Sequence, residues 1–194
     1  MPGLLKFSGF IDRISEVVGK FAGYLVLACC LISAGNACIR YLFNYSSNGW
    51  LEIQWYLFAA VFLLAAPHTL RRDEHVRIDV IVGRFSRRTQ VWIDLFGFFL
   101  FLLPICCVIL YYGIPFGLES LRSAEMSSNS GGLIVWPAKI LVPIGFALMI
   151  LQGLSEIIKR IEYLRGRLDE SAFTKQASPA RQEIDAIRQA NRID

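Results

Sequence analysis

Apolar residues gather in four long runs along the chain, at about residues 21–43, 50–70, 91–116 and 133–158. Each run is long enough to cross the hydrocarbon core of a bilayer, which takes roughly 20 mostly apolar residues. Lipid offers the backbone no hydrogen-bond partner, so each run is expected to be helical. The third run is apolar without the alternation of a barrel strand. The pattern therefore predicts an all-α integral membrane protein with four transmembrane helices.

Polar positions divide the chain into three parts. Residues 1–20 form a cytoplasmic N-terminal segment, residues 21–158 the membrane domain, and residues 159–194 a cytoplasmic tail. All but three of the 20 Lys and Arg residues lie in the N-terminal segment, between residues 71 and 90, or after residue 158; the exceptions are Arg40, Arg122 and Lys139. Because basic residues stay on the cytoplasmic side, both termini are predicted to be cytoplasmic.

The overall composition agrees with a membrane protein. Hydrophobic residues make up 55% of the chain and charged residues 19%, whereas a soluble domain has about 45–50% and about 25%. The basic balance follows from the topology rule, so we do not interpret it as affinity for nucleic acid.

The connection HTLRRDEHVRIDVIVGRFSRR, residues 68–88, is rich in arginine. Its apolar residues Ile78, Ile81, Val82 and Phe85 have helical spacing, which favours an amphipathic interfacial helix between the second and third transmembrane helices. Its arginines are expected to contact phospholipid head groups: Arg71, Arg72, Arg77, Arg84, Arg87 and Arg88. With Phe85 as the one aromatic residue among them, nucleic-acid binding is disfavoured.

The sequence gives little support for a metal site, a cofactor site or a catalytic site. The two histidines, His68 and His75, are seven residues apart at one helix end and beyond it. The five cysteines sit inside apolar runs without a CxxC spacing, as small packing residues do. No serine has a visible His–acid partner. We predict no metal, no cofactor and no enzymatic activity.

A charged side chain inside the membrane is costly unless it is paired or reaches the surface. Two such residues are Arg40, near the end of the first helix, and Glu52, near the start of the second. A short connection makes the two helices antiparallel neighbours, and an Arg40–Glu52 ion pair is predicted to pin this hairpin. The alternative is that each side chain reaches the nearby surface. Asn36 and Gln54 are expected to form hydrogen bonds between helices.

In order and topology, residues 20–158 resemble the small membrane subunit of TRAP (tripartite ATP-independent periplasmic) transporters, the DctQ-like family. The likeness rests on RYLFNYSSNGWLEIQWYLF, 40–58, and FLLAAPHTLRRDEHVRIDV, 62–80. The matching positions are Arg40, Tyr41, Trp50, Glu52, His75, Val76, Arg77, Ile78 and Asp79. PIGFALMILQGL, 143–154, is similar to the last helix of the family. Leu51, where many members have a second acid, and the long tail depart from the pattern.

The resemblance implies a fixed scaffold in the bacterial inner membrane. Its partners would be a large TRAP membrane subunit, which moves an organic acid or related solute with a sodium gradient, and the periplasmic solute-binding protein that delivers the solute. Two alternatives remain open. A stand-alone small oligomeric transporter or channel would show uptake without a second membrane protein, and a redox or enzyme subunit would carry a visible cofactor absorbance.

Overall fold

The computed structural model describes residues 2–45, 47–72 and 85–168. The described chain is helical, with α1 (Pro2–Phe43), α2 (Asn48–Arg71), α4 (Arg87–Gly97), the π-helical turn η1 (Phe98–Leu102), α5 (Leu103–Arg122) and α6 (Trp136–Leu164). Most of the predicted interfacial helix, and the tail from residue 169, lie outside the described residues.

Four helices are long and apolar enough to cross a membrane, since α4, η1 and α5 form one continuous helix from Arg87 to Arg122. The structure thus confirms the predicted four-helix, all-α architecture. The first helix is longer than its apolar run, because it already begins at Pro2. Its 42 residues span about 63 Å, roughly twice the hydrocarbon core. The polar N-terminal half stays helical because Ser8, Ile11 and Ser15 pack in its buried stripe.

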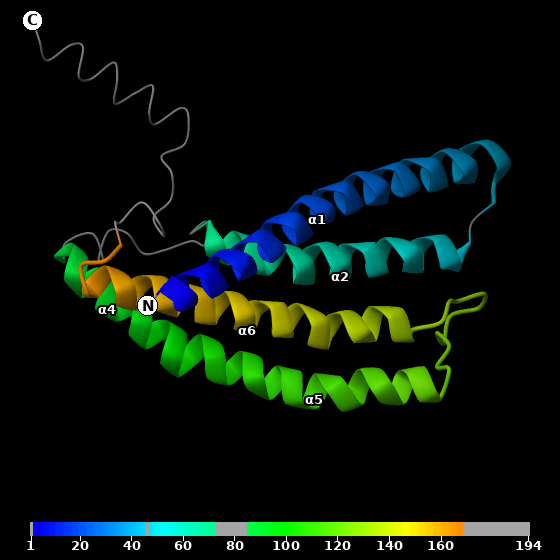
Figure 1. Ribbon diagram of the computed structural model, residues 1–194. Coiled ribbons are helices and arrows are strands. Elements are labelled where there is room, and N and C mark those ends of the chain that lie inside the picture. Colours follow the sequence, from blue (N-terminus) through cyan, green and yellow to red (C-terminus); the bar gives the residue numbers. More distant parts are fainter. Residues whose placement is uncertain (1, 46, 73–84, 169–194) are drawn as a thin grey trace, which may run out of the picture.

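The helices are arranged as a layered bundle (Figure 1). Helix α6 packs on α5, α2 and α1, and α1 also packs on α2. The short connection between residues 43 and 48 makes α1 and α2 antiparallel neighbours, as predicted. Figure 1 shows α1 crossing close to α6 near the N-terminus and diverging from α2 toward its own C-terminus.

The π-helical turn Phe98–Leu102 ends two residues before Pro104. Proline has no N–H, and its ring collides with the carbonyl of the residue four positions earlier in a regular helix. A wider turn before the proline relieves this collision without breaking the helix. The aromatic side chain of Phe98 is buried on this turn.

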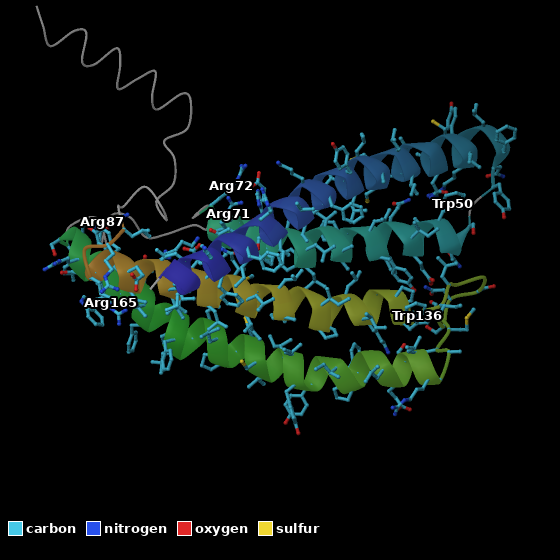
Figure 2. All side chains as sticks on the ribbon, in the orientation of Figure 1. Trp50, Arg71, Arg72, Arg87, Trp136 and Arg165 are labelled. Atoms are coloured by element: carbon cyan, nitrogen blue, oxygen red, sulfur yellow. The ribbon has the colours of Figure 1, made fainter. Side chains whose placement is uncertain are left out.

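The two ends of the bundle differ in chemistry (Figure 2). One end, here called the arginine end, carries Arg71, Arg72, Arg87 and Arg165. The opposite end, the loop end, carries Trp50 and Trp136 and the connections between α1 and α2 and between α5 and α6.

Candidate functional site: a buried ionic network and an open polar pocket

Two adjacent turns of α6 carry buried charges at the arginine end. Glu156, Lys159 and Arg160 are 1%, 5% and 2% exposed. One carboxylate oxygen of Glu156 lies 2.5 Å from Lys159 Nζ, and the other lies 2.5 Å from a guanidinium nitrogen of Arg160. The spacing of three and four residues places the side chains on one face of the helix, where they meet.

The same face of α6 binds the N-terminal half of α1. Lys159 Nζ lies 2.9 Å from Asp12 Oδ2, and the Ser155 hydroxyl donates to Asp12 Oδ1 at 3.0 Å. The amide nitrogen of Gln152 donates to Asp12 at 3.0 Å, and the hydroxyl of Ser15 donates to the Gln152 oxygen at 2.6 Å. Five polar side chains therefore satisfy one another where α1 crosses α6.

Two further helices join this network. Arg71 of α2 donates to Glu16 of α1 at 3.2 Å. Arg160 of α6 donates to Asp94 of α4 at 3.2 Å, and its guanidinium stacks 4.6 Å from the ring centroid of Phe98. We call this set the ionic network: Asp12, Ser15, Glu16, Arg71, Asp94, Gln152, Ser155, Glu156, Lys159 and Arg160.

The ionic network ties α1, α2, α4 and α6 together at one end. Each of its carboxylates contacts at least one cation, so the buried charges compensate one another. A fully paired buried set is costly to break, because losing one member leaves another buried without a partner. The sequence analysis missed this network. The signal was a polar stripe at positions 152, 155, 156 and 159 of one helix, matched by 8, 12 and 15 of another.

Glu52 has a different role from the one predicted. It is 3% exposed, and its carboxylate accepts hydrogen bonds from the Ser127 hydroxyl, from the Asn129 amide at 2.8 Å and from the Leu133 N–H at 2.6 Å. These donors all lie in the connection between α5 and α6. Glu52 therefore fastens the start of α2 to this loop.

The predicted Arg40–Glu52 ion pair is wrong, because these loop donors occupy the carboxylate and Arg40 is exposed on α1. Among the described residues, Arg40 has no acidic partner. The physical reason is the direction of the side chains: Leu51 and Gln54 of α2 face α1, whereas Glu52, about 100° from Leu51 around the helix, faces the loop.

Arg40 instead lines an open pocket of about 530 Å³ between α1 and α2 at the loop end. We call it the α1–α2 pocket. Polar and apolar side chains both line it: Ser33, Asn36, Ala37, Arg40, Tyr41, Asn44, Leu51 and Gln54. The predicted polar residues Asn36 and Gln54 thus share one pocket. The backbone carbonyl of Gln54 also accepts a weak bond from the Cys29 thiol at 3.8 Å, where the helices are still close.

The loop between α5 and α6 has a second anchor. Lys139 of α6 donates to the Glu125 carboxylate at 2.5 Å and lies 4.4 Å from the centroid of the Phe116 ring. The Lys139 ammonium holds the pKa of Glu125 below its usual value. The backbone adds an isolated bridge between Met126 and Ile134. The loop is therefore fixed to α2 and to α6.

The remaining predicted residues are scattered. Tyr41 is 90% exposed and Trp50 43% exposed at the loop end. Arg71 lies inside the ionic network, whereas Arg88 is exposed. Arg72 is also exposed, and Arg87 is partly buried. The other predicted positions lie outside the described residues: His75, Val76, Arg77, Ile78, Asp79 and Arg84. In the part of the chain that the structure describes, no group of three His, Cys, Asp or Glu residues could hold a metal ion.

Comparison with known families decides what this helical body is. The model of the DctQ component of tripartite ATP-independent periplasmic transporters matches residues 29–162. The chain belongs to this family. The match begins inside α1 and ends in the last turn of α6, so it includes the α1–α2 pocket and the α6 side of the ionic network. In a comparison with curated proteins, none matched.

Membership confirms the resemblance found in the sequence. This DctQ component is a multi-pass membrane protein of a TRAP transporter, a transport subunit and not an enzyme. The family implies a complex with a large membrane subunit and a periplasmic binding protein. The N-terminal half of α1, which contributes Asp12, Ser15 and Glu16 to the ionic network, lies before the matched residues.

Proposed function

We propose that this DctQ subunit is a fixed scaffold that supports the large subunit during sodium-coupled uptake of an organic acid or related solute. In this account the periplasmic binding protein delivers the solute, and the large subunit supplies the sodium and solute sites. The DctQ subunit contributes a rigid surface against which the large subunit is held in the membrane.

The ionic network is the observation that carries this proposal. It joins four helices by compensated, buried charges, which is the arrangement expected of a body that keeps its shape. A path for an anionic solute would instead need cationic or hydrogen-bonding groups that the solute can reach. In the ionic network, the cations Lys159 and Arg160 are already engaged with carboxylates.

The proposed orientation places both termini and the arginine end in the cytoplasm and the loop end in the periplasm. The clustering of Arg71, Arg72, Arg87 and Arg165 at one end supports this, because basic residues are retained on the cytoplasmic side. Arginines outside the network, such as Arg88, would contact phospholipid head groups of the inner leaflet. Trp50 and Trp136 suit the opposite interface, where amphipathic rings are enriched.

Transport in reconstituted vesicles tests the proposal. The large subunit would be reconstituted with and without the DctQ subunit, and the probe would be the organic acid that most stabilises the binding protein of the same system against heat. We expect uptake when both membrane subunits, the binding protein and an inward sodium gradient are present. Uptake by the DctQ subunit alone would contradict the scaffold role and favour a stand-alone transporter. Equal uptake after the sodium gradient is collapsed would contradict sodium coupling.

A further inference from the structure

The outer half of α1 differs from the other spans in how little of it is covered. In the most apolar 18 residues of α1, 6% are buried, compared with 28% in the most apolar 18 residues of α6. A lipid-facing helix is expected to expose large apolar side chains, as α5 does with Val108, Tyr111 and Tyr112. The outer half of α1 also exposes Ser33, Ala37 and Arg40, which is unusual for a surface that meets only lipid.

These residues form a single stripe. Ser33, Asn36, Ala37 and Arg40 are spaced at i, i+3, i+4 and i+7, so they share one face of α1, and that face lines the α1–α2 pocket. Below the stripe, α1 and α2 still touch at the bond from Cys29 to Gln54. Above it the two helices diverge (Figure 1), and the pocket lies between them at the loop end.

The charge of the α1–α2 pocket indicates which chemical group would bind there. Arg40 is its cation, and no acidic residue lines it. The nearest candidate in the sequence, Glu52, already binds the α5–α6 loop. A guanidinium inside a membrane domain is stabilised by a carboxylate or by carbonyl oxygens, which can receive its planar set of donors. Asn36 and Gln54 add amide groups that can bond a neighbouring helix.

A second hollow of about 280 Å³, apolar in character, adjoins the pocket and shares Asn36 with it. Its lining includes Leu31, Ile39 and Trp50. Gly35 also lines it, and a Cβ added there would meet open space. A polar centre with an apolar flank is typical of a contact between helices, in which small residues allow close approach and a few hydrogen bonds fix the register.

We propose that the α1–α2 pocket and its apolar flank form the docking surface for the large TRAP subunit, whose inserted segment presents a carboxylate or carbonyl oxygens to Arg40. This inference rests on the proposed scaffold function and names the surface through which it acts. The exposed face of α5 faces lipid. Helix α1 is fixed to α6 at the arginine end, and its other half, at the loop end, contacts the large subunit.

Photocrosslinking in the assembled complex tests the docking surface. A benzophenone amino acid would replace Ala37 in the pocket or, as the matched control, Val108 on the exposed face of α5. After irradiation of membranes containing both subunits, we expect an adduct with the large subunit from position 37 and lipid adducts from position 108. Lipid adducts alone at position 37, adducts with the large subunit at position 108 alone, or no adduct at either position would overturn the proposal.

Charge reversal gives an independent readout. Arg40→Glu should lower the amount of large subunit that co-purifies by at least about tenfold, because a desolvated charge pair becomes a repulsion. Arg122→Glu, which reverses an exposed charge at the same end on α5, should leave it unchanged. Equal yields for Arg40→Glu and the unaltered chain would overturn the proposal. If the unaltered chain itself retained no large subunit, the scaffold function would fail as well, so the two failures are distinguishable.

Discussion

The two ends of α1 lie in opposite environments. At the arginine end, Asp12 and Ser15 meet complementary groups on α6, and each polar atom of the crossing is used within the chain. At the loop end, Arg40 and Asn36 line an open pocket shared with α2. One helix thus has its polar groups satisfied internally over its first half and left for a partner over its second. The comparison shows that the role of a polar residue in a membrane helix depends on the group that it contacts, and its presence alone does not reveal that role.

The largest effect is expected inside the ionic network. Glu156→Ala would remove the buried carboxylate that contacts both Lys159 and Arg160, leaving each cation with a single acidic partner among the described residues, Asp12 or Asp94. Breaking such a buried set costs about 3–5 kcal/mol. We expect a marked fall in the thermal unfolding temperature of the purified subunit in detergent. An unchanged unfolding temperature would mean that the arginine end is not the rigid half of the molecule.

The junction of α1 with α6 should respond next. Asp12→Asn keeps the size of the side chain and removes its charge, which weakens the bond to Lys159 by about 1.5–3 kcal/mol. Hydrogen–deuterium exchange should become faster across residues 2–20 and stay unchanged in α5. Arg13→Gln is the control, because Arg13 is exposed on the same helix and has no acidic partner among the described residues. Equal exchange in both variants would refute the assignment of Asp12 as the main anchor.

Glu52→Ala should affect the loop end and leave the arginine end intact. The carboxylate holds the Asn129 amide and the Leu133 N–H, and leaving them without an acceptor costs about 1–3 kcal/mol. Faster exchange confined to residues 123–135 is the expected result. Faster exchange in α1 instead would indicate that Glu52 pins the α1–α2 hairpin, as the sequence had suggested.

A smaller effect concerns pH at the same loop. Lys139 depresses the pKa of Glu125 in the folded chain. The stability that the ionised carboxylate adds to the loop is therefore fully present above the ordinary glutamate pKa of about 4.3. It is lost as the pH falls through the lower folded-state pKa. The protection of the loop amides, after correction for the intrinsic dependence of exchange on pH, should therefore fall at acidic pH in the unaltered chain. Glu125→Gln should show faster exchange already at neutral pH, with less dependence on pH; identical profiles would refute the anchor.

The smallest change in stability is expected at Arg40. Because its side chain is exposed and has no acidic partner among the described residues, Arg40→Ala should shift the unfolding free energy of the isolated subunit by no more than about 0.5 kcal/mol. Thermal unfolding of the purified chain measures this. A loss as large as that for Glu156→Ala would mean that Arg40 stabilises the subunit itself, which would remove the contrast between the two ends.

The sequence predicted the helical body well because hydrocarbon length and backbone hydrogen bonding leave few alternatives for long apolar runs. It placed the start of the first helix near residue 21, whereas α1 begins at Pro2, since polar residues that pack on another helix are invisible to an apolar count. The partner of Glu52 was wrong because the direction of a side chain around the helix, not its depth, decides which group it reaches. Predicting the ionic network would have required comparing the polar faces of two helices. The sequence alone does not show which helix faces pack together.

The central claim is that this DctQ subunit works as part of a larger membrane complex. The most direct measurement is purification in mild detergent through a tag on the C-terminal tail, followed by native mass determination. The account predicts a complex of one 21.9 kDa chain with one much larger hydrophobic protein. A homo-oligomer of the 21.9 kDa chain without a second protein would contradict it, and would make the α1–α2 pocket a candidate for a permeation path.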